Sequence, residues 1–404
     1  MKNILIISGG IEAIPGIIKA KEMGLNVVVS DGNPNAPGFN YSDDKIIAST
    51  YDHKETYRKV KNYHTLKKNI DGVICIASDV PYTVAYVAEK LQLPGIPLKS
   101  ANLAIDKILM KDSLSRSGVL VPDYHEIKSF AEFNNIINTW DYPLIIKPVD
   151  SRGARGVLRL VPGVDLDWAW NYSLKNSPSG RVMIERYLDG VQLSTESIIV
   201  KSKCYTCGYS DRNYEYLDRY APHIIENGSD MPTIFSKHVK KRIDETIKMG
   251  AESLGIKNGI IKGDIVISDN EVKVIELATR LSGGYFSTNM IPSSTGIDLI
   301  KEAIKISLGE KIRHKDLLPK HNKYISQRYI FPNAGVIKKI KGIKKLKNNS
   351  SLKFFNIHAK VGQEIGKITS HPSRAGMVIA EGISRKDAVN QCTKAINDIG
   401  FDYQ

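Results

Sequence analysis

The sequence predicts an α/β domain at the N-terminus, followed by α+β units and a small β-rich unit at the C-terminus. Over the first hundred residues, short apolar runs alternate with helical patterns, which is typical of a parallel, doubly wound sheet. After residue 121, strand-like runs joined by turns mix with helices, which indicates an α+β arrangement. With 404 residues, the chain is long enough for roughly two to four domains and a cleft between them.

In the N-terminal unit, the apolar run at residues 3–8 predicts the first buried strand, which stops at Gly9-Gly10. The elements expected next are a helix at 12–23, strands at 26–30, 72–77 and 93–96, and a helix at 82–91. Gly9, Gly10 and, about twenty residues later, Asp31 hint at a dinucleotide site, but the third glycine of the usual pattern is absent. An NAD(P)-dependent oxidoreductase therefore stays open as a function of another class.

The rest of the chain is expected to contain helices and strands in mixed order. Helices are expected at 101–120 (ending at Gly118), 129–139, 237–254, 298–309 and 385–398. Strands are expected at 143–148, 157–160, 182–185, 193–201, 259–268 and 271–277. From about residue 320 onward, a lysine-rich stretch is expected to form a separate β-rich cap that ends in a helix.

Composition argues against several classes of partner. The net charge is +14, but the basic segment 338–353 has lysines diluted by Asn and Ser, so we expect a solvated face and no nucleic-acid partner. No apolar run reaches the ~18 residues that span a bilayer, so no membrane partner is expected. The four cysteines are too sparse for a disulfide framework, which favours a reduced, cytoplasmic location. Cys204 and Cys207 lack the second pair of a zinc site and are interpreted as ordinary hairpin residues.

A lysine beside a glycine-rich turn indicates phosphate binding. Lys147 ends a buried strand, and the turn Ser151–Gly156 (SRGARG) follows it. The lysine can balance phosphate charge, while backbone N–H groups of the turn close over the β- and γ-phosphates. A surface hairpin with a solvated lysine fits the same pattern.

A pair of carboxylates indicates a metal site. Asp264 and Glu276 lie in two strand-like runs joined by the turn 268–270, and their even spacing places them on one face of the hairpin, across from each other. Facing carboxylates repel each other unless a cation bridges them, and Mg²⁺ bound to ATP phosphates is the usual partner. Alternatively, Asp264 is a charge at a strand edge and Glu276 pairs with Arg280.

A strand that stops at a turn, 182–190, offers backbone groups that could face an adenine edge. In this order, the three features resemble the ATP-grasp superfamily over nearly the whole chain. The resemblance implies that the protein uses ATP and Mg²⁺ or Mn²⁺. It also implies a Rossmann-like pre-ATP domain at 1–100, a linker helix at 101–120, a lid subdomain at 121–190, a metal-binding subdomain at 191–315 and a C-terminal subdomain at 316–404.

The resemblance assigns roles to individual residues. Lys107, in the segment IDKILMK, and Lys147 are expected to bind phosphate, Asp264 and Glu276 to bind metal, and Arg280 to act as the catalytic arginine. The other residues expected at ATP are Ser151, Gly153 and Gly156 of the lid, Glu185, Arg186, Tyr187 and Leu188 of the adenine-facing hinge, and Gln192. Gln192 replaces the ribose-binding glutamate of many members, and Ala278 replaces a common second metal ligand.

Two later segments, 280–284 (RLSGG) and 371–376 (HPSRAG), resemble the carboxylate–amine ligase branch, which includes L-amino-acid ligases and carbamoyl-phosphate-synthase-like proteins. Candidates for the substrate site, each with an equally open structural role, are Glu226, His223, Arg212, Gly283 and Gly284. The implied activity is ADP-forming: a small-molecule carboxylate, amino-acid-like, becomes an acyl phosphate and passes to an amine, in an enzyme that is often a homodimer. Bicarbonate activation through carboxyphosphate and nucleotide binding without turnover stay open as alternatives.

Overall fold

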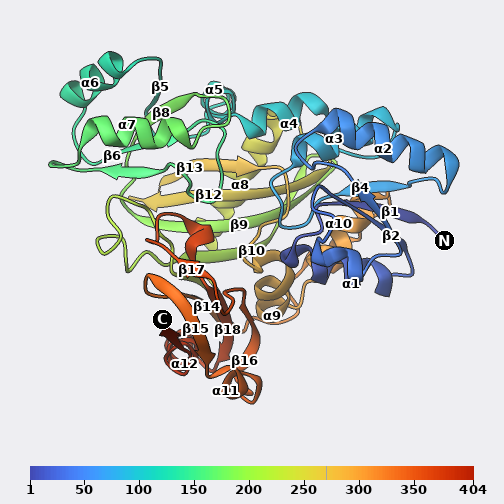
Figure 1. Ribbon diagram of the computed structural model, residues 1–404. Helices are drawn as coiled ribbons and strands as arrows, with labels where there is room; N and C mark the ends of the chain where they lie inside the picture. The colour runs from blue at the N-terminus through green and yellow to red at the C-terminus, as the bar shows by residue number, and fades with distance from the viewer. Residues whose placement is uncertain (270) are drawn as a thin grey trace.

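The structure, a computed structural model, describes residues 1–269 and 271–404. Its N-terminal domain is built on a parallel four-stranded sheet in the order β3-β2-β1-β4, at the right of Figure 1. Its elements are β1 (Asn3–Ile7), η1 (Ile11–Ala13), α1 (Ile14–Glu22), β2 (Asn26–Asp31), η2 (Pro37–Asn40), β3 (Asp44–Ile47), α2 (His53–Leu66), β4 (Gly72–Ile74) and α3 (Pro81–Lys90). Ile4 and Ile6 of β1 share a core with α1, whereas Leu5 and Ile7 share one with α2 and α3. The predicted doubly wound sheet is confirmed.

Two expectations for the end of this domain are wrong. Residues 93–96 form no strand, because Pro94 has no N–H to donate to a ladder. The single helix expected at 101–120 is split into α4 (Leu98–Ile105) and α5 (Lys107–Arg116). Between them Asp106 is extended, and its carboxylate accepts hydrogen bonds from the N–H groups of Ile108 and Leu109 at 2.9 and 3.0 Å, which caps α5.

A small antiparallel sheet in the order β5-β8-β6-β7 lies at the upper left of Figure 1. It consists of β5 (Tyr124–Ile127), β6 (Leu144–Pro148), β7 (Leu158–Leu160) and β8 (Val182–Arg186), covered by α6 (Phe130–Thr139) and α7 (Leu166–Lys175). Ile146 and Ile184 point into the core under these helices. Because side chains alternate along a strand, Lys147 and Glu185 point to the opposite face.

The central sheet has eight strands in the order β13-β12-β9-β10-β11-β14-β18-β16. They are β9 (Val191–Val200), β10 (Lys203–Arg212), β11 (Gly228–Met231), β12 (Gly259–Ser268), β13 (Glu271–Ala278), β14 (Tyr324–Ile330), β16 (Leu352–Ile357) and β18 (Gly376–Gly382). The helices of this part are α8 (Lys237–Ser253), η3 (Phe286–Met290), α9 (Ile291–Thr295), α10 (Leu299–Ser307) and η4 (His314–Leu317). The last three strands of the order belong to the expected C-terminal cap. Because β14 pairs with β11, the expectation of a separate cap is wrong at the level of backbone hydrogen bonds.

The C-terminal residues also form a smaller sheet in the order β17-β15-β19. Its strands are β15 (Gly335–Lys341), β17 (Glu364–Ile365) and β19 (Gly400–Tyr403), and the helices nearby are α11 (Ile343–Lys347), η5 (His371–Ser373) and α12 (Arg385–Asn397). The chain therefore ends in a strand that pairs with β15, and the expectation that it ends in a helix is wrong. In the described part of the chain, no helix has the length and apolarity needed to cross a membrane.

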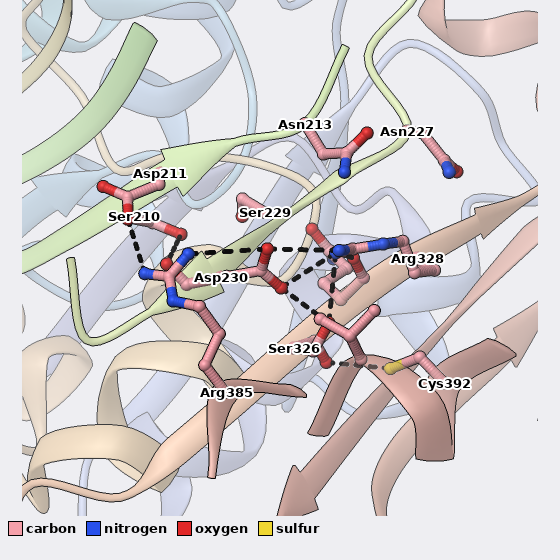
Figure 2. A network of polar contacts seen from close by, with 12 residues as sticks. Ser210, Asp211, Asn213, Asn227, Ser229, Asp230, Ser326, Arg328, Arg385 and Cys392 are labelled. Carbon is pink, nitrogen blue, oxygen red and sulfur yellow. Dashed lines mark hydrogen bonds and ion pairs between the residues drawn. The ribbon is translucent and has the colours of Figure 1, made fainter. Parts of the chain in front are cut away.

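A buried network of ion pairs joins the C-terminal strands and α12 to the middle of the central sheet (Figure 2). Asp230 on β11 accepts hydrogen bonds from the guanidinium of Arg328 on β14 at 2.9 and 3.1 Å. Arg385, at the start of α12, donates to Asp211 on β10 at 2.5 Å. These contacts fix the C-terminal residues against the sheet that carries the site described next.

Candidate active site

One cavity of about 1060 Å³ lies where the N-terminal domain, the small sheet, the central sheet and the C-terminal residues meet. The sequence-predicted residues that line it are Lys107, Lys147, Ser151, Gly153, Glu185, Arg186, Tyr187, Leu188, Gln192, Arg212, Glu226, Asp264, Glu276, Arg280, Gly283 and Gly284. Gly156 and His223 do not line it. The structure thus brings nearly all of the predicted site residues to one cavity.

One wall of the cavity carries buried lysines. Lys107 donates a hydrogen bond from Nζ to the backbone oxygen of Ser151 at 2.8 Å, and Lys147 forms an ion pair with Glu185. Lys111 lies behind them, fully buried, with Nζ 3.1 Å from Glu185 Oε2, and burial lowers its pKa to about 8. Although burial alone raises the pKa of Glu185, Lys111 and Lys147 hold that pKa below its usual range.

The carboxylate of Glu185 is engaged by two lysines, and its expected place beside adenine stays a prediction. The residues after it fit the predicted hinge better. Tyr187 donates its backbone N–H to the carbonyl of Pro143 at 3.2 Å, and both Tyr187 and Leu188 line the cavity. The guanidinium of Arg186 pairs with Asp123 at 3.2 Å, so the charge of this residue is already engaged by a protein group.

The glycine-rich loop is held at both flanks. Arg152 donates from Nη1 to the backbone oxygen of Asp79 at 3.0 Å, and its guanidinium lies over the ring of Tyr51 at 4.8 Å from the centroid. On the other side, the backbone oxygen of Gly153 accepts a hydrogen bond from the N–H of His371 at 3.1 Å. Gly156 has φ of 75°, and a Cβ there would come within 2.7 Å of Pro148, so it shapes the loop from behind instead of lining the cavity.

The predicted carboxylate pair faces across β12 and β13: Asp264 is directly opposite Glu276. Asp264 is buried, and its Oδ1 accepts a hydrogen bond from Ser194 Oγ at 3.1 Å and lies 3.2 Å from Arg212 Nη1. Burial raises its pKa, but the charges of Lys262 and Arg212 outweigh burial and lower the pKa to about 2. Asn270, in the predicted turn, lies outside the described residues.

The predicted alternative, an ion pair between Glu276 and Arg280, is not what the structure has. Arg280 Nε lies 3.3 Å from Asp79 Oδ1, in the loop after β4 of the N-terminal domain. Glu276 Oε1 instead lies 3.9 Å from Lys107 Nζ. Arg280 is therefore held by a residue 201 positions away in the sequence, and its guanidinium lines the same cavity as the lysines.

Of the substrate candidates, Arg212 and Glu226 form an ion pair at 2.5 Å on the cavity wall. Arg374, from the segment after η5, donates to the backbone oxygen of Glu226 at 3.2 Å and stacks on the ring of Tyr329 at 3.4 Å from the centroid. His223 is wrongly placed by the sequence prediction. Its ring packs against Tyr172 of α7 at a centroid distance of 5.3 Å, because Pro222 and His223 pair with β7.

Sequence reasoning missed Glu12, Asp79, Lys111, Glu196 and Lys262. Asp79 had a usable signal, since ligands of parallel α/β sheets bind at the carboxyl ends of strands and Asp79 follows β4. Glu196 is a fully buried charged residue in β9. Its carboxylate accepts hydrogen bonds from the N–H of Ser282 at 3.2 Å and from Ser287 Oγ at 2.9 Å, so it holds the loop that follows Arg280.

The predicted hint of a dinucleotide site is not supported. Asp31 Oδ2 accepts a hydrogen bond from the N–H of Gly9 at 2.8 Å, and Oδ1 accepts one from the N–H of Asn33 at 2.8 Å. Gly38 donates its N–H to the carbonyl of Gly9 at 2.7 Å, which closes the same loop. Both oxygens of the carboxylate needed for a ribose are therefore engaged by backbone N–H groups.

Comparison with known families gives three matches in the same order as the parts of the fold. The ATP-grasp N-terminal domain matches residues 17–95, the ATP-grasp domain matches residues 104–284, and the L-amino acid ligase C-terminal domain 2 matches residues 328–404. A curated relative, the carbamoyl phosphate synthase large chain of Kocuria rhizophila, is 22% identical over 310 residues, which are 74% of this chain and 27% of that protein. The chain thus spans about a quarter of the length of the curated relatives it matches.

Solved structures share the whole fold. L-amino acid ligase from Bacillus licheniformis superposes with a TM-score of 0.83 at 20% identity, over 100% of this chain and 99% of that one. Phosphoribosylglycinamide synthetase from Anaerococcus prevotii gives 0.75 at 19%, over 100% of both chains. Biotin carboxylase from Campylobacter jejuni gives 0.73 at 18%, over 99% of this chain and 92% of that one. The chain therefore belongs to the ATP-grasp superfamily of ligases, with an L-amino acid ligase C-terminal domain 2.

Proposed function

We propose that this protein is an ADP-forming ligase that converts the carboxylate of an amino-acid-like substrate to an acyl phosphate and passes the acyl group to an amine. The observation that carries the proposal is the composition of one cavity. Lys107, Lys147, the glycine-rich loop, the facing pair Asp264 and Glu276, and Arg280 all line it. The match of residues 328–404 to the L-amino acid ligase C-terminal domain 2 supports an amine as the acceptor of the acyl group.

The residues fit ATP and a divalent metal ion. No group of three or more potential ligand side chains occurs among the described residues, but Mg²⁺ needs only one or two carboxylates when phosphates and water complete its shell. Asp264 and Glu276 would hold Mg²⁺ or Mn²⁺, which when bound neutralises charge on the β- and γ-phosphates. Lys262 and Arg212 keep Asp264 ionised, as a metal ligand must be.

The chain's own residues then have separable tasks. Lys107 and Lys147 balance the charge of the triphosphate, and the N–H groups of the glycine-rich loop cover its end. The substrate carboxylate attacks the γ-phosphorus in line, and Arg280, held by Asp79, stabilises the charge on the transferred group. The loop keeps water from the acyl phosphate until the amine attacks its carbonyl carbon, after which phosphate leaves and the amine loses a proton.

Bicarbonate activation is the second candidate, because solved structures with this fold include biotin carboxylase and N5-carboxyaminoimidazole ribonucleotide synthetase. The two candidates differ in what triggers ADP release. A ligase requires an organic acid, whereas a carboxylase requires bicarbonate and is indifferent to amino acids. A homodimeric state and a cytoplasmic location stay predictions from the sequence.

The decisive assay is ADP release with hydroxylamine present, because hydroxylamine traps an acyl phosphate as a hydroxamate whatever the natural acceptor is. We expect a subset of amino acids to give ADP and hydroxamate in equal amounts. Glu276→Gln is expected to lower this rate at least about 10²-fold, the scale for losing a preorganised charge-stabilising group. The matched control is Glu271→Gln, which changes an exposed glutamate of the same strand and should keep full activity. Full activity in Glu276→Gln, or no hydroxamate from any acid, contradicts the proposal.

A further inference from the structure

Six carboxylates line the cavity, and among the described residues five of them have a basic partner within 4.0 Å. The pairs are Asp79 with Arg280, Glu185 with Lys147, Glu226 with Arg212, Asp264 with Lys262, and Glu276 with Lys107. Glu12 is the sixth, and no Lys, Arg or His of the described chain lies within that distance of its carboxylate. It is the cavity's one negative charge that the described protein groups leave without a cation.

Glu12 is placed at the cavity by the N-terminal domain. It lies in η1, directly after β1, and its Oε2 accepts a hydrogen bond from the N–H of Gly284 at 2.8 Å. None of the described groups donates to its second oxygen, Oε1. Gly283 makes the approach possible, since a Cβ at this position would stand only 2.9 Å from Oε2. The loop after Arg280 is thus shaped to receive this carboxylate.

Cations act on Glu12 only from a distance: Arg374, His358 and Arg280 each lower its pKa, but none lies within 4.0 Å of its carboxylate. Burial and, after it, the charge of Glu12 raise the pKa of Tyr285, whose hydroxyl accepts a hydrogen bond from Asn356 at 2.9 Å. Burial raises the pKa of Tyr329, and the charge of Glu12 adds to the rise. The Arg374 guanidinium covers the Tyr329 ring and donates a hydrogen bond to the backbone oxygen of Glu226. Burial outweighs the hydrogen bond from Gly284 and these distant charges and raises the pKa of Glu12.

A carboxylate kept in such a place without a cation costs free energy, and a function that supplies the cation offsets the cost. A protonated amine needs a carboxylate oxygen as its acceptor, and Oε1 of Glu12 receives no hydrogen bond from the described groups.

We propose that Glu12 binds a protonated primary amino group of the substrates through Oε1. The proposal deepens, and rests on, the proposed ligase function, because it specifies that one substrate is recognised as a cation at the end of the cavity formed by Glu12, Gly284 and Tyr285. Two sources share this chemistry: the amino group of the acid that is activated, and the amine that accepts the acyl group.

The test compares the full-length protein with Glu12→Gln, which keeps the shape and the acceptor for the Gly284 N–H but removes the charge. Glu12→Asp retains the charge on a shorter arm, and Glu89→Gln, an exposed position on α3, is the matched control. Each is assayed by hydroxamate trapping with an amino acid and with the same acid lacking its amino group, and by ligation at varied amine concentration.

If the amino group belongs to the activated acid, Glu12→Gln raises the KM for the amino acid in the trapping assay about 10- to 100-fold and leaves the KM for the deamino acid and for ATP unchanged. If it belongs to the acceptor, trapping is unchanged and the KM for the amine rises by a similar factor. Glu12→Asp should recover part of the loss in either case, whereas a neutral structural role predicts no such recovery.

Unchanged KM values for both amino substrates, or an equal rise for the deamino acid, overturn the inference. A wild-type protein that yields no hydroxamate contradicts the ligase function instead, and the inference is then tested by calorimetric binding in the presence of Mg-ADP. Amino acids should bind the wild type about 10- to 100-fold more tightly than Glu12→Gln, and deamino acids equally to both. Equal binding of amino acids to both proteins overturns it.

Discussion

The protein has two clusters of buried charged residues, and they differ in how completely their polar groups are hydrogen-bonded. In the network of Figure 2, each carboxylate is matched by donors. Asp230 accepts from two guanidinium nitrogens of Arg328 and from Ser326 Oγ at 2.7 Å. Asp211 accepts from Thr233 Oγ1 at 2.5 Å, from the N–H of Ile234 at 2.9 Å and from Arg385.

In the cavity, charged residues of the same types lack some of their hydrogen-bond partners. Lys111 Nζ and Glu185 Oε2 are 3.1 Å apart but not in hydrogen-bond geometry, and Arg212 Nε is buried without a partner among the described groups. No cation of the described residues lies within 4.0 Å of the Glu12 carboxylate. A polar network that is fully satisfied makes a structure rigid, whereas one with spare donors and acceptors stores binding capacity for a ligand. The hydrogen bonding of the two clusters therefore distinguishes the network of Figure 2, which joins two parts of the central sheet, from the candidate active site.

The largest effect on folding is expected from a change in the network of Figure 2. Asp230→Ala leaves Arg328 buried without its carboxylate, so we expect a loss of about 3–5 kcal/mol in the free energy of unfolding, measured by chemical denaturation. Asp398→Ala, which breaks the exposed ion pair with Lys345, should cost less than about 1 kcal/mol. Similar small losses in both variants mean that the buried network does not hold the C-terminal residues in place.

The next effect, in the cavity, falls on catalysis. Lys147→Met removes the charge that we propose balances the phosphates, while Lys111 still balances Glu185. ADP release should therefore fall about 10²- to 10³-fold, with a smaller stability loss than in Asp230→Ala. The control, Lys128→Met, alters an exposed lysine beside the small sheet and should release ADP at the wild-type rate. The contrast between the two clusters fails if Lys147→Met loses as much stability as Asp230→Ala and keeps its activity when folded.

The smallest effect concerns Glu196, whose carboxylate accepts hydrogen bonds but has no ion pair with any described residue. Burial outweighs these bonds and raises its pKa from 4.5 to about 7. Since the folded-state pKa is the higher one, stability is fully present below about pH 4.5 and is lost as the pH rises toward 7.

Glu196→Gln should therefore flatten the dependence of the free energy of unfolding on pH between 4.5 and 7, a difference of about 1–3 kcal/mol over this interval. Denaturation curves at several pH values measure it. An identical slope in the wild type and in Glu196→Gln shows that Glu196 does not titrate in this range.

The sequence predicted the local parts of the site well. Lys147 beside a glycine-rich turn and the pair Asp264 and Glu276 depend on strand alternation and spacing, and the structure has both. The pairing of the carboxylates nevertheless depends on a feature that no spacing rule supplies. In the regular part of the hairpin Ile265 faces Val274, so Asp264 would face Ile275; a β-bulge at that point brings Glu276 opposite Asp264.

The parts that could not be predicted depend on long-range docking. Glu12 meets Gly284 across 272 positions, and Asp79 meets Arg280 across 201. No pattern within η1 or after β4 reports which loop will pack against it. His223 failed for the same reason: its polar side chain resembles a site residue, but the pairing of its segment with β7 takes it out of the cavity.

The residues that line the cavity come from different domains of the chain, and this division affects how such proteins can diversify. Lys107, Lys147, Asp264, Glu276 and Arg280 all fall within the segment 104–284, whereas Glu12 and Arg374 belong to the domains on either side. Under the proposed function, changes in the flanking domains alter which two molecules are joined and leave the residues proposed to bind ATP untouched. A new substrate pair can arise by inheritance of a different neighbour, without reinvention of the chemistry.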